Sequence, residues 1–479
     1  MGGNKIICRS MVFCALLFGC SVLAPLQADA KVFVVNSAED ASVACASSCT
    51  LRGAIEEANT NNETDVILVD SSISSIKLTT ELILDSVHSS EGLFDIAIAG
   101  NVVIDGNRKT RVFSVAQGTK AYMRGLSITG GFIHDYKNGE GAGIHNSGEL
   151  TLYHVAVYSN YVKGHAKDSQ KSYVRGAGIF NGGGAKLSIV RSNIGPRNVL
   201  DAKGQSAKAL GAGVYNAGTL SVERSNIFYN QSYTTASGVD GAAESLGGGM
   251  YLAGKIPAHI VESSLYSNTV RSEIVESGFR AKAQGAGIYT MPWVEMYMTN
   301  STVSANKAIS YGNTGPKSLT YAHGGAIFTG AYSKLYFANV TMAKNKVETP
   351  SSLIPEGTAV GHSLFGVIMP ASEVVFKNSI IESEGKNCNH ALDSAGNNIV
   401  SDSSCVLTEP GDAQNMVAGI TPLSNYGGFT LLHGLESNAA AINAGNPDGC
   451  TDFSGHLLSK DQRGKYRPQV GCDVGAYEL

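Results

Sequence analysis

Residues 211–230 read GAGVYNAGTLSVERSNIFYN, and this pattern recurs five more times in the middle of the chain. The other segments are GAGIHNSGELTLYHVAVYSN from Gly141, GAGIFNGGGAKLSIVRSNIGPRN from Gly176, GGGMYLAGKIPAHIVESSLYSN from Gly247, GAGIYTMPWVEMYMTNSTVSAN from Gly285 and GGAIFTGAYSKLYFANVTMAKN from Gly324. Their starts lie 35, 35, 36, 38 and 39 residues apart. Such a period predicts a stacked array in which each unit buries one face against the next.

Each unit has the pattern of short strands joined by tight turns. In the unit from Gly211, Leu220 and Val222 are apolar and alternate with Ser221 and Glu223, which is a strand period and not a helical one. The glycine-rich start supplies corners, because glycine adopts positive φ at no steric cost. We therefore predict an all-β fold: a right-handed parallel β-helix with a short N-terminal capping helix and a C-terminal disulfide-containing module.

The chain divides into four expected parts. These are a signal peptide at 1–30, an N-terminal cap at 31–64, the parallel β-helix at 65–407 and a C-terminal module at 408–479.

Each repeat closes on an Asn, and stacked coils place these residues at one corner. Their side-chain amides form either a hydrogen-bonded ladder or ordinary turns, and the sequence leaves both open. The six are Asn160, Asn198, Asn230, Asn268, Asn306 and Asn345.

Five inserts separate the repeats, each leaving the coil after the closing Asn. They are Tyr161–Arg175, Val199–Leu210, Gln231–Leu246, Thr269–Gln284 and Lys307–His323. Equivalent insertions in a solenoid emerge on one side, so we predict a row of long loops along one edge. Loops on a rigid scaffold often carry binding residues, although simply tolerated insertions are the alternative.

The first two inserts are basic, and they supply the candidate binding residues. These are Lys163, His165, Lys167, Lys171, Arg175, Lys203 and Lys208. Such an edge favours an acidic glycan, and a solvated run of charge is the alternative. The exposed aromatic residues expected in the inserts are Tyr161, Tyr173, Tyr233, Phe279, Tyr311 and Tyr321.

Composition and the N-terminus point to an exported protein. Glycine makes up 56 of 479 residues, as a chain with many corners requires, and the net charge of −4 argues against nucleic acid as a partner. Lys5 and Arg9 precede an apolar stretch at 11–24 and an A-x-A site at 28–30, the pattern of a signal peptide. We expect a secreted, periplasmic or cell-surface protein without a membrane span after signal removal; a lipoprotein anchored at Cys20 is the alternative.

Six cysteines lie outside the expected signal peptide, all of them outside the repeats. An even number in an exported chain predicts disulfides. Six cysteines allow 15 pairings. Proximity along the chain favours Cys45–Cys49, Cys388–Cys405 and Cys450–Cys472. No spacing typical of a zinc site occurs, and we expect neither a metal nor a cofactor.

Two groups of polar residues are candidates for catalysis of polysaccharide cleavage, which requires acidic and basic side chains converging on one face. The first group is His134, Asp135, Lys137, Glu140 and His145. The second is Glu223, Arg224, Lys186, Arg191, His259 and Glu262. Ordinary polar residues on the solvent face of strands are the favoured explanation of both groups, since outward positions of strands are polar in any case. No catalytic residue is therefore assigned.

Both ends of the chain resemble a known group of secreted proteins. Residues 49–59, CTLRGAIEEAN, resemble the CSLREA motif of bacterial secreted β-helix proteins, with Gly53 in place of its Glu. Thr50 is the expected N-cap of a helix whose apolar face is formed by Leu51, Ile55 and Ala58. Loss of the Glu removes the reciprocal bond of a capping box. The helix is expected to cover the open end of the first coil.

The C-terminal region from about Ile420 resembles the choice-of-anchor Q domain. The matching pieces include NYGGFT from Asn425, AINAG from Ala441, DQRG from Asp461 and CDVGAYE from Cys472. The repeat units also resemble, more weakly, those of polymorphic outer membrane proteins, which are adhesins. The resemblance implies a secreted β-helix protein and no particular reaction.

These observations favour a non-enzymatic role. We expect an adhesin-like protein that binds an extracellular glycan or cell-surface ligand through one edge of the solenoid. A polysaccharide lyase or glycoside hydrolase on a pectate-lyase-like β-helix is the first alternative, and a structural surface protein without a ligand is the second. Whether the chain is an enzyme, and its oligomeric state, stay open at this point.

Overall fold

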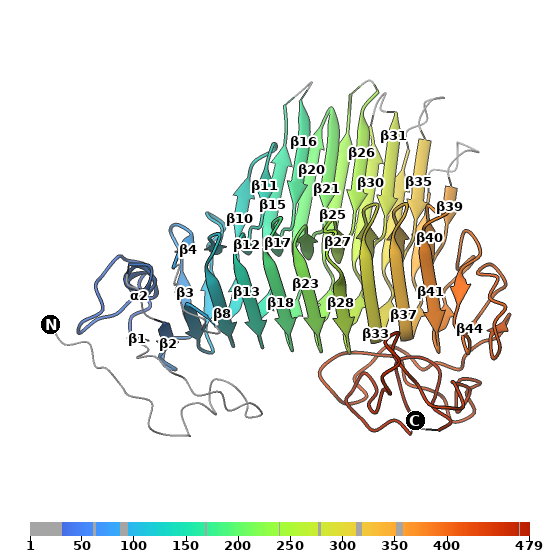
Figure 1. Cartoon of the computed structure of the whole chain (residues 1–479). Coiled ribbons are helices and arrows are strands. Elements are labelled where there is room, and N and C mark those ends of the chain that lie inside the picture. The colour runs from blue at the N-terminus through green and yellow to red at the C-terminus, as the bar shows by residue number, and fades with distance from the viewer. Residues whose placement is uncertain are drawn as a thin grey trace.

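The chain forms a parallel β-helix capped at one end and flanked by a C-terminal module near the other (Figure 1). The computed structural model describes residues 31–479 except 61–63, 87–93, 168–169, 239, 276–278, 313–318, 351–357 and 469. Every pairing between named strands is parallel, as in β13–β18 and β18–β23. The predicted fold class is therefore confirmed. The signal peptide and the lipidation site at Cys20 lie outside the described residues.

Four sheets run along the molecule. Sheet 1 has 22 strands: β1 (Lys31–Val35), β2 (Asp65–Val69), β3 (Ser75–Lys77), β5 (Ile96–Ala99), β6 (Val103–Asp105), β8 (Lys120–Arg124), β9 (Ser127–Thr129), β13 (Glu149–Tyr153), β14 (Ala156–Val157), β18 (Lys186–Val190), β19 (Asn193–Ile194), β23 (Thr219–Glu223), β24 (Asn226–Phe228), β28 (Ala258–Val261), β29 (Ser264–Tyr266), β33 (Glu295–Ser304), β37 (Lys334–Ala343), β41 (Glu373–Lys377), β42 (Ile380–Glu382), β43 (Asp393–Ser394), β44 (Ile399–Val400) and β45 (Ala413–Gln414). Sheet 2 has nine strands: β4 (Leu82–Leu84), β7 (Phe113–Val115), β12 (Ile144–Asn146), β17 (Ile179–Asn181), β22 (Val214–Asn216), β27 (Met250–Leu252), β32 (Ile288–Thr290), β36 (Ile327–Thr329) and β40 (Leu364–Gly366).

Sheets 3 and 4 are built mainly from the inserts, and each has seven strands. Sheet 3 contains β10 (Phe132–His134), β15 (Tyr161–His165), β20 (Val199–Gly204), β25 (Gln231–Ala236), β30 (Thr269–Ile274), β34 (Lys307–Tyr311) and β38 (Lys346–Glu348). Sheet 4 contains β11 (Gly139–Glu140), β16 (Lys171–Arg175), β21 (Ser206–Leu210), β26 (Ala242–Leu246), β31 (Arg280–Gln284), β35 (Leu319–His323) and β39 (Thr358–Val360).

The glycine that opens each repeat has a positive φ. Gly176 and Gly211 have φ of 54° and 66°, and the same holds at Gly141, Gly247, Gly285 and Gly324. A Cβ at Gly211 would lie 2.4 Å from the carbonyl oxygen of Val214. Both the conformation and the space therefore require glycine at this corner, which is why the repeat shows it in every unit.

The inserts leave one side of the solenoid, as expected, but they are strands and not long loops. In each insert one strand runs outward and the next runs back, so that sheets 3 and 4 form a double-layered projection, seen at the top of Figure 1. Val162, Leu200, Ala202 and Ala209 are buried between the two layers. The prediction of loops was wrong. In these segments small buried residues alternate with larger exposed ones, so the apolar–polar alternation that identifies a strand is weak.

Small side chains let the two layers of the projection approach closely. A Cβ on Gly164 would lie 2.5 Å from Val174 Cγ1, so even alanine does not fit there. Buried hydroxyls between the layers find partners: Ser245 Oγ donates to the carbonyl oxygen of Ser232 at 2.7 Å, and Thr234 donates to Ser272 Oγ at 3.0 Å. A paired hydroxyl avoids most of the cost of burying a polar group.

The N-terminal helix covers the first coils. Helix α2 (Leu51–Ala58) begins at Thr50, whose side-chain oxygen accepts a hydrogen bond from Gly53 N at 3.0 Å. Leu51, Ile55 and Ala58 are buried in the main core, as predicted. A Cβ on Gly53 would lie 1.9 Å from the carbonyl oxygen of Val43, so the preceding loop excludes any larger residue there. Strand β1 precedes this helix and pairs with β2, so the main sheet already starts at Lys31.

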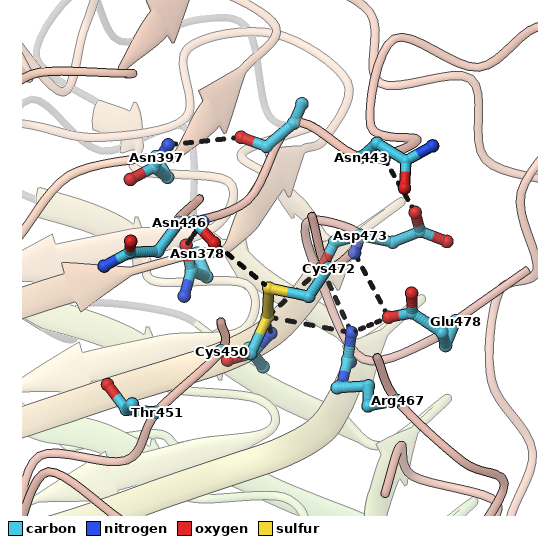
Figure 2. Close-up of a disulfide and its surroundings, with 12 residues drawn as sticks. Asn378, Asn397, Asn443, Asn446, Cys450, Thr451, Arg467, Cys472, Asp473 and Glu478 are labelled. Atoms are coloured by element: carbon cyan, nitrogen blue, oxygen red, sulfur yellow. Dashed lines mark hydrogen bonds and ion pairs between the residues drawn. A yellow bond between two sulfur atoms is a disulfide. The ribbon is translucent and has the colours of Figure 1, made fainter. Parts of the chain in front are cut away.

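The C-terminal module packs along one corner of sheet 1, beneath β33 and β37 in Figure 1. Asn300 Nδ2 donates to the carbonyl oxygen of Lys460 at 2.8 Å, and Asn378 Oδ1 accepts from Asn446 N at 2.9 Å. The structure contains the disulfides Cys45–Cys49, Cys388–Cys405 and Cys450–Cys472, the pairs expected from proximity. Figure 2 shows the last of these. The last of them lies beside the buried Arg467.

This pairing predicts that protein starting at Lys31 has no free thiol. Titration under denaturing, non-reducing conditions should detect close to zero thiols, because all its cysteines are in disulfides. The same sample after reduction serves as the positive control. Two or more reactive thiols before reduction would contradict the pairing.

The closing Asn residues do form a ladder. Hydrogen bonds of 2.9–3.0 Å run from the Nδ2 of each to the Oδ1 of the next. They join Asn160, Asn198, Asn230, Asn268, Asn306 and Asn345. All six are completely buried. The inserts therefore leave the coil without disturbing its register.

Candidate functional site

The projection separates the seven basic residues that the sequence singled out. Lys163, His165 and Lys203 lie on sheet 3. Lys171, Arg175 and Lys208 lie on sheet 4, and Lys167 follows β15 near the outer end of the projection. Because the two layers pack back to back, these residues form two groups on opposite faces and not one basic edge.

On the face of sheet 3, the charges are largely internally paired. Asp201 Oδ2 accepts hydrogen bonds from the Tyr161 hydroxyl at 2.7 Å and lies 2.8 Å from His165 Nε2. Arg271 pairs with Glu273 at 3.0 Å and lies over the ring of Tyr311. Lys163 and Lys203 on the same face have no ion-pair partner among the described residues.

Sheet 2 carries a row of stacked aromatic rings, which we call the ring row. Its members are His145, Phe180, Tyr215, Tyr251, Tyr289, Phe328 and Phe365. Successive ring centroids are 4.8–5.5 Å apart and the planes lie within 18° of parallel. Leu210 and Leu246 of sheet 4 pack on this row. The ring faces are occupied by each other, and Phe180, Tyr215, Tyr251 and Phe328 are buried.

Sequence reasoning missed the ring row, although the repeat contains its signal. The fifth residue of each glycine-rich opening is aromatic in five units: Phe180, Tyr215, Tyr251, Tyr289 and Phe328. A residue at the same place in every coil stacks on its equivalents at the spacing of strands in a sheet. Position within the repeat therefore predicts the row, whereas the earlier emphasis on insert aromatics does not.

Sheet 4 gathers three cations around one carboxylate above the ring row. Lys208 Nζ, Arg280 NH2 and Lys282 Nζ lie 3.3, 3.1 and 3.6 Å from oxygens of Glu244. Burial alone would raise the pKa of Glu244, but Lys208, Lys282 and Arg280 hold it below its usual value. Glu244 is therefore ionised at neutral pH, and the group keeps an excess of two positive charges.

A cleft of about 470 Å3 opens where sheet 4 meets sheet 2. Arg280, Lys282, Gln284, Tyr321 and His323 line one side of it. Tyr289, Phe328 and Phe365 of the ring row line the other side. A second hollow of about 250 Å3 on sheet 4 is lined by Lys208 and Glu244 and shares Arg280 with the cleft. The cationic group thus lies between two concave surfaces.

His323 is the most strongly perturbed histidine in this cleft. Burial, and then the nearby Lys282, lower its pKa to about 4. Its Nδ1 lies 3.2 Å from Gln284 Nε2, and its ring stacks on Phe365 with centroids 3.9 Å apart. The imidazole is therefore neutral and firmly oriented at neutral pH. Burial also raises the pKa of Tyr289 to about 12, so its phenol stays protonated.

Part of the first candidate catalytic group assembles at the other end of the ring row. Glu140 forms a short contact with Arg175 and lies 3.5 Å from His145 Nε2. His134 is exposed on β10, while Asp135 accepts backbone hydrogen bonds from Lys137 and Asn138 within a turn. The structure therefore unites Glu140 and His145 and leaves the other three apart.

The second candidate group divides in the same way. Arg224 pairs with Glu262 at 2.5 Å and Glu223 at 3.5 Å, at a corner of sheet 1 that Arg191 also occupies. Lys186 pairs with Glu149, and His259 stacks on Tyr297.

Among the described residues, no group of three or more metal-ligating side chains could hold a metal ion. Within the same ranges, no helix is long and apolar enough to cross a membrane.

Comparisons with known proteins find similarity to solved structures but to no known family. No family model matches the chain, and no curated protein matches it, so the resemblance at the two ends is not confirmed. A solved structure described as pectate lyase Pel9A is similar over 93% of this chain and 96% of its own, at 12% identity and a TM-score of 0.45. Likeness at this level says nothing about activity.

Proposed function

We propose that this is an exported protein that binds an acidic polysaccharide in the cleft between sheets 2 and 4. The observation that carries the proposal is the convergence of Lys208, Arg280 and Lys282 on the single carboxylate of Glu244. Two of those three positive charges have no counter-charge within the group, so a carboxylate or sulfate group on a sugar is the matching partner. The three disulfides support an oxidising compartment.

The outward face of sheet 4 as a whole supports an anionic ligand. Its strands carry Lys171, Arg175, Lys208, Arg280 and Lys282 on this face against only Glu140 and Glu244. On the opposite face, Asp201 and Glu273 are paired with His165 and Arg271, while Lys163 and Lys203 have no ion-pair partner among the described residues. An excess of one sign along a surface raises the local concentration of oppositely charged ligands and speeds their association.

The ring row supports a preformed site for an extended chain. Its rings are locked by mutual stacking, and Gln284 and His323 are held by each other. Tyr289 stays protonated, so its hydroxyl is a donor to sugar oxygens. A rigid surface loses little conformational entropy on binding, which favours affinity.

Neutralising the cationic group should weaken binding of oligogalacturonate about tenfold or more, because three charge contacts are lost. The variant is K208Q/R280Q/K282Q, measured by isothermal titration calorimetry at low salt. The matched control is K163Q/K203Q/R271Q, which removes the same charges from sheet 3. Dextran, a neutral glucan, is the ligand control.

Two outcomes would contradict the proposal. One is a sheet 3 variant that loses binding while the sheet 4 variant keeps it, which places the site on the other face. The other is equal affinity for dextran and oligogalacturonate, which removes the argument from charge. An acidic polysaccharide on a cell surface as the natural ligand would make the protein adhesin-like.

A lyase acting on the same acidic chain is the second candidate, supported by one observation. His323 is neutral and lies in the cleft beside Lys282 and Tyr321. Gln284 Nε2 donates to its Nδ1, so the imidazole can accept a substrate proton only after this hydrogen bond breaks. In an elimination, a base removes the proton beside the uronate carboxylate while the glycosidic bond to oxygen breaks. Incubation with polygalacturonate should then raise the ultraviolet absorbance of unsaturated products, and H323N should abolish the rise. Absence of any rise leaves binding as the function.

A further inference from the structure

A second basic pocket lies where the C-terminal module meets sheet 1, with a lining distinct from that of the cleft. Three of its lining residues, His154, Arg191 and Arg224, directly follow β13, β18 and β23. Each has a positive φ, of 53°, 44° and 46°, so the same corner of three successive coils supplies them. Phe429, Lys460, Arg463 and two glycines, Gly428 and Gly464, come from the module. The pocket volume is about 420 Å3.

The module covers the later corners of the same row and leaves these three open. Asn300 lies within β33, Asn339 within β37 and Asn378 directly after β41, and all three hydrogen-bond to the module. Thr430 of the module donates to the carbonyl oxygen of Glu262, the corner residue of the coil between. The pocket therefore lies at the edge of the docked module, with coil residues on one side and module residues on the other.

Two of the four cations in the pocket lining have carboxylate partners and two do not. Arg224 pairs with Glu262 and Glu223, and Arg463 pairs with Asp461 at 2.7 Å. Across the described ranges, no carboxylate lies within ion-pair distance of Arg191 or Lys460, and no acidic residue lines the pocket. The pocket thus holds uncompensated positive charge.

The remaining lining is fixed in place and leaves space for a ligand. Arg463 lies 3.8 Å over the ring of Tyr477, and the rings of His154 and Phe429 meet edge to face at 5.7 Å. Burial, and then Arg191, lower the pKa of His154, so this ring is neutral and acts as a hydrogen-bonding group. A Cβ at Gly464 would meet nothing within 4 Å, so the backbone there borders open space.

We propose that this pocket binds a single oxyanion group, a phosphate or sulfate ester carried on a sugar. Arg191 and Arg224 occupy the same corner of adjacent coils, about 4.8 Å apart, and both line the pocket. Guanidinium forks match the geometry of phosphate and sulfate oxygens, and Lys460 contributes a third charge. The proposal does not depend on the cleft, because the two sites share no lining residue.

The test titrates the full chain with glucose 6-phosphate, galactose 6-sulfate and unmodified galactose by calorimetry at constant ionic strength. We expect at least one of the two esters to bind and galactose not to bind. The ester with the higher affinity shows whether the pocket prefers phosphate or sulfate. The variant R191Q/K460Q should bind about tenfold or more weakly. The matched control is R197Q/K255Q, which removes one Arg and one Lys that do not line the pocket; Arg197, like Arg191, has a positive φ. This control should bind the esters as the parent does.

A charge reversal keeps the test decisive if the double variant fails to fold. Lys460 is exposed, so K460E should fold normally and lose ester binding. The cleft variant K208Q/R280Q/K282Q should bind the esters as the parent does, which separates this site from the proposed polysaccharide site. No measurable binding of either ester to the parent, or unchanged affinity in both R191Q/K460Q and K460E, would overturn the proposal.

Discussion

Replacing Arg467 with Met should lower the free energy of unfolding of the C-terminal module by about 3–5 kcal/mol, the typical cost of breaking a buried ion pair by removing one partner. Arg467 is completely buried, and its NH1 lies 2.5 Å from Glu478 Oε2. It also donates to the carbonyl oxygen of Asp473 at 3.1 Å (Figure 2). A further bond runs to the carbonyl oxygen of Gly475 at 2.7 Å. Met fills similar volume but removes these three hydrogen bonds and leaves the buried carboxylate of Glu478 without its cation, with the backbone N of Asp473 as a remaining donor.

The effect should be local to the module and should depend on Glu478. Limited proteolysis with mass spectrometry should show cleavage after about residue 414 in R467M, while coils of the repeats stay protected, since a solenoid is stabilised coil by coil. The double variant R467M/E478Q should recover part of the loss, because it removes the uncompensated charge. K465M, which replaces an exposed cation two residues away, is the matched control. Equal destabilisation in the single and double variants would show that the ion pair is not the cause.

The sequence predicts the stacked architecture well because each repeat in the sequence corresponds to one coil of the solenoid. The glycine that opens each unit has a positive φ in every coil, and the closing Asn residues form one ladder. The helix cap at Thr50 also follows from local residue types. These features depend on contacts that recur at a fixed spacing, so periodicity in the sequence is sufficient to locate them.

The projection was not predictable in the same way because hydrophobic alternation is weak there. The buried positions of its strands are occupied by Ala207, Ser232, Thr234 and Ser272 as well as by Val162. Two layers that pack closely require small residues, so the pattern alternates in size and not in polarity. Period-based reasoning counts apolar residues and therefore reads such a segment as a loop.

The candidate site depended on this missed feature. Lys208 was singled out from charge alone, but its partners Arg280 and Lys282 come from a strand 72 or more residues later in the chain. Only the register of β21, β26 and β31 brings them around Glu244. Convergence across coils is a property of the stacked sheet, and a linear run of charge in one insert cannot reveal it.

The Asn ladder should be the most sensitive part of the repeats to a single substitution. Asn268 makes four side-chain hydrogen bonds: Nδ2 donates to Ile227 O and Asn306 Oδ1, both at 2.9 Å. Its Oδ1 accepts from the backbone N of Asn230 at 3.1 Å and from Asn230 Nδ2 at 2.9 Å. Alanine removes all four bonds and leaves their partner atoms in a fully buried corner.

Asn268→Ala should therefore cost about 3 kcal/mol or more, since each buried group left unpaired costs about 1–3 kcal/mol. Denaturant unfolding followed by circular dichroism gives the overall change, and hydrogen exchange with mass spectrometry locates it. Faster exchange should centre on the corners at Asn230, Asn268 and Asn306, because the loss breaks the ladder in both directions. The exposed Asn138→Ala, in a turn of the projection, is the control and should unfold like the parent. An Asn268→Ala protein as stable as this control would mean that the amides are turn residues whose hydrogen bonds add nothing to the stack.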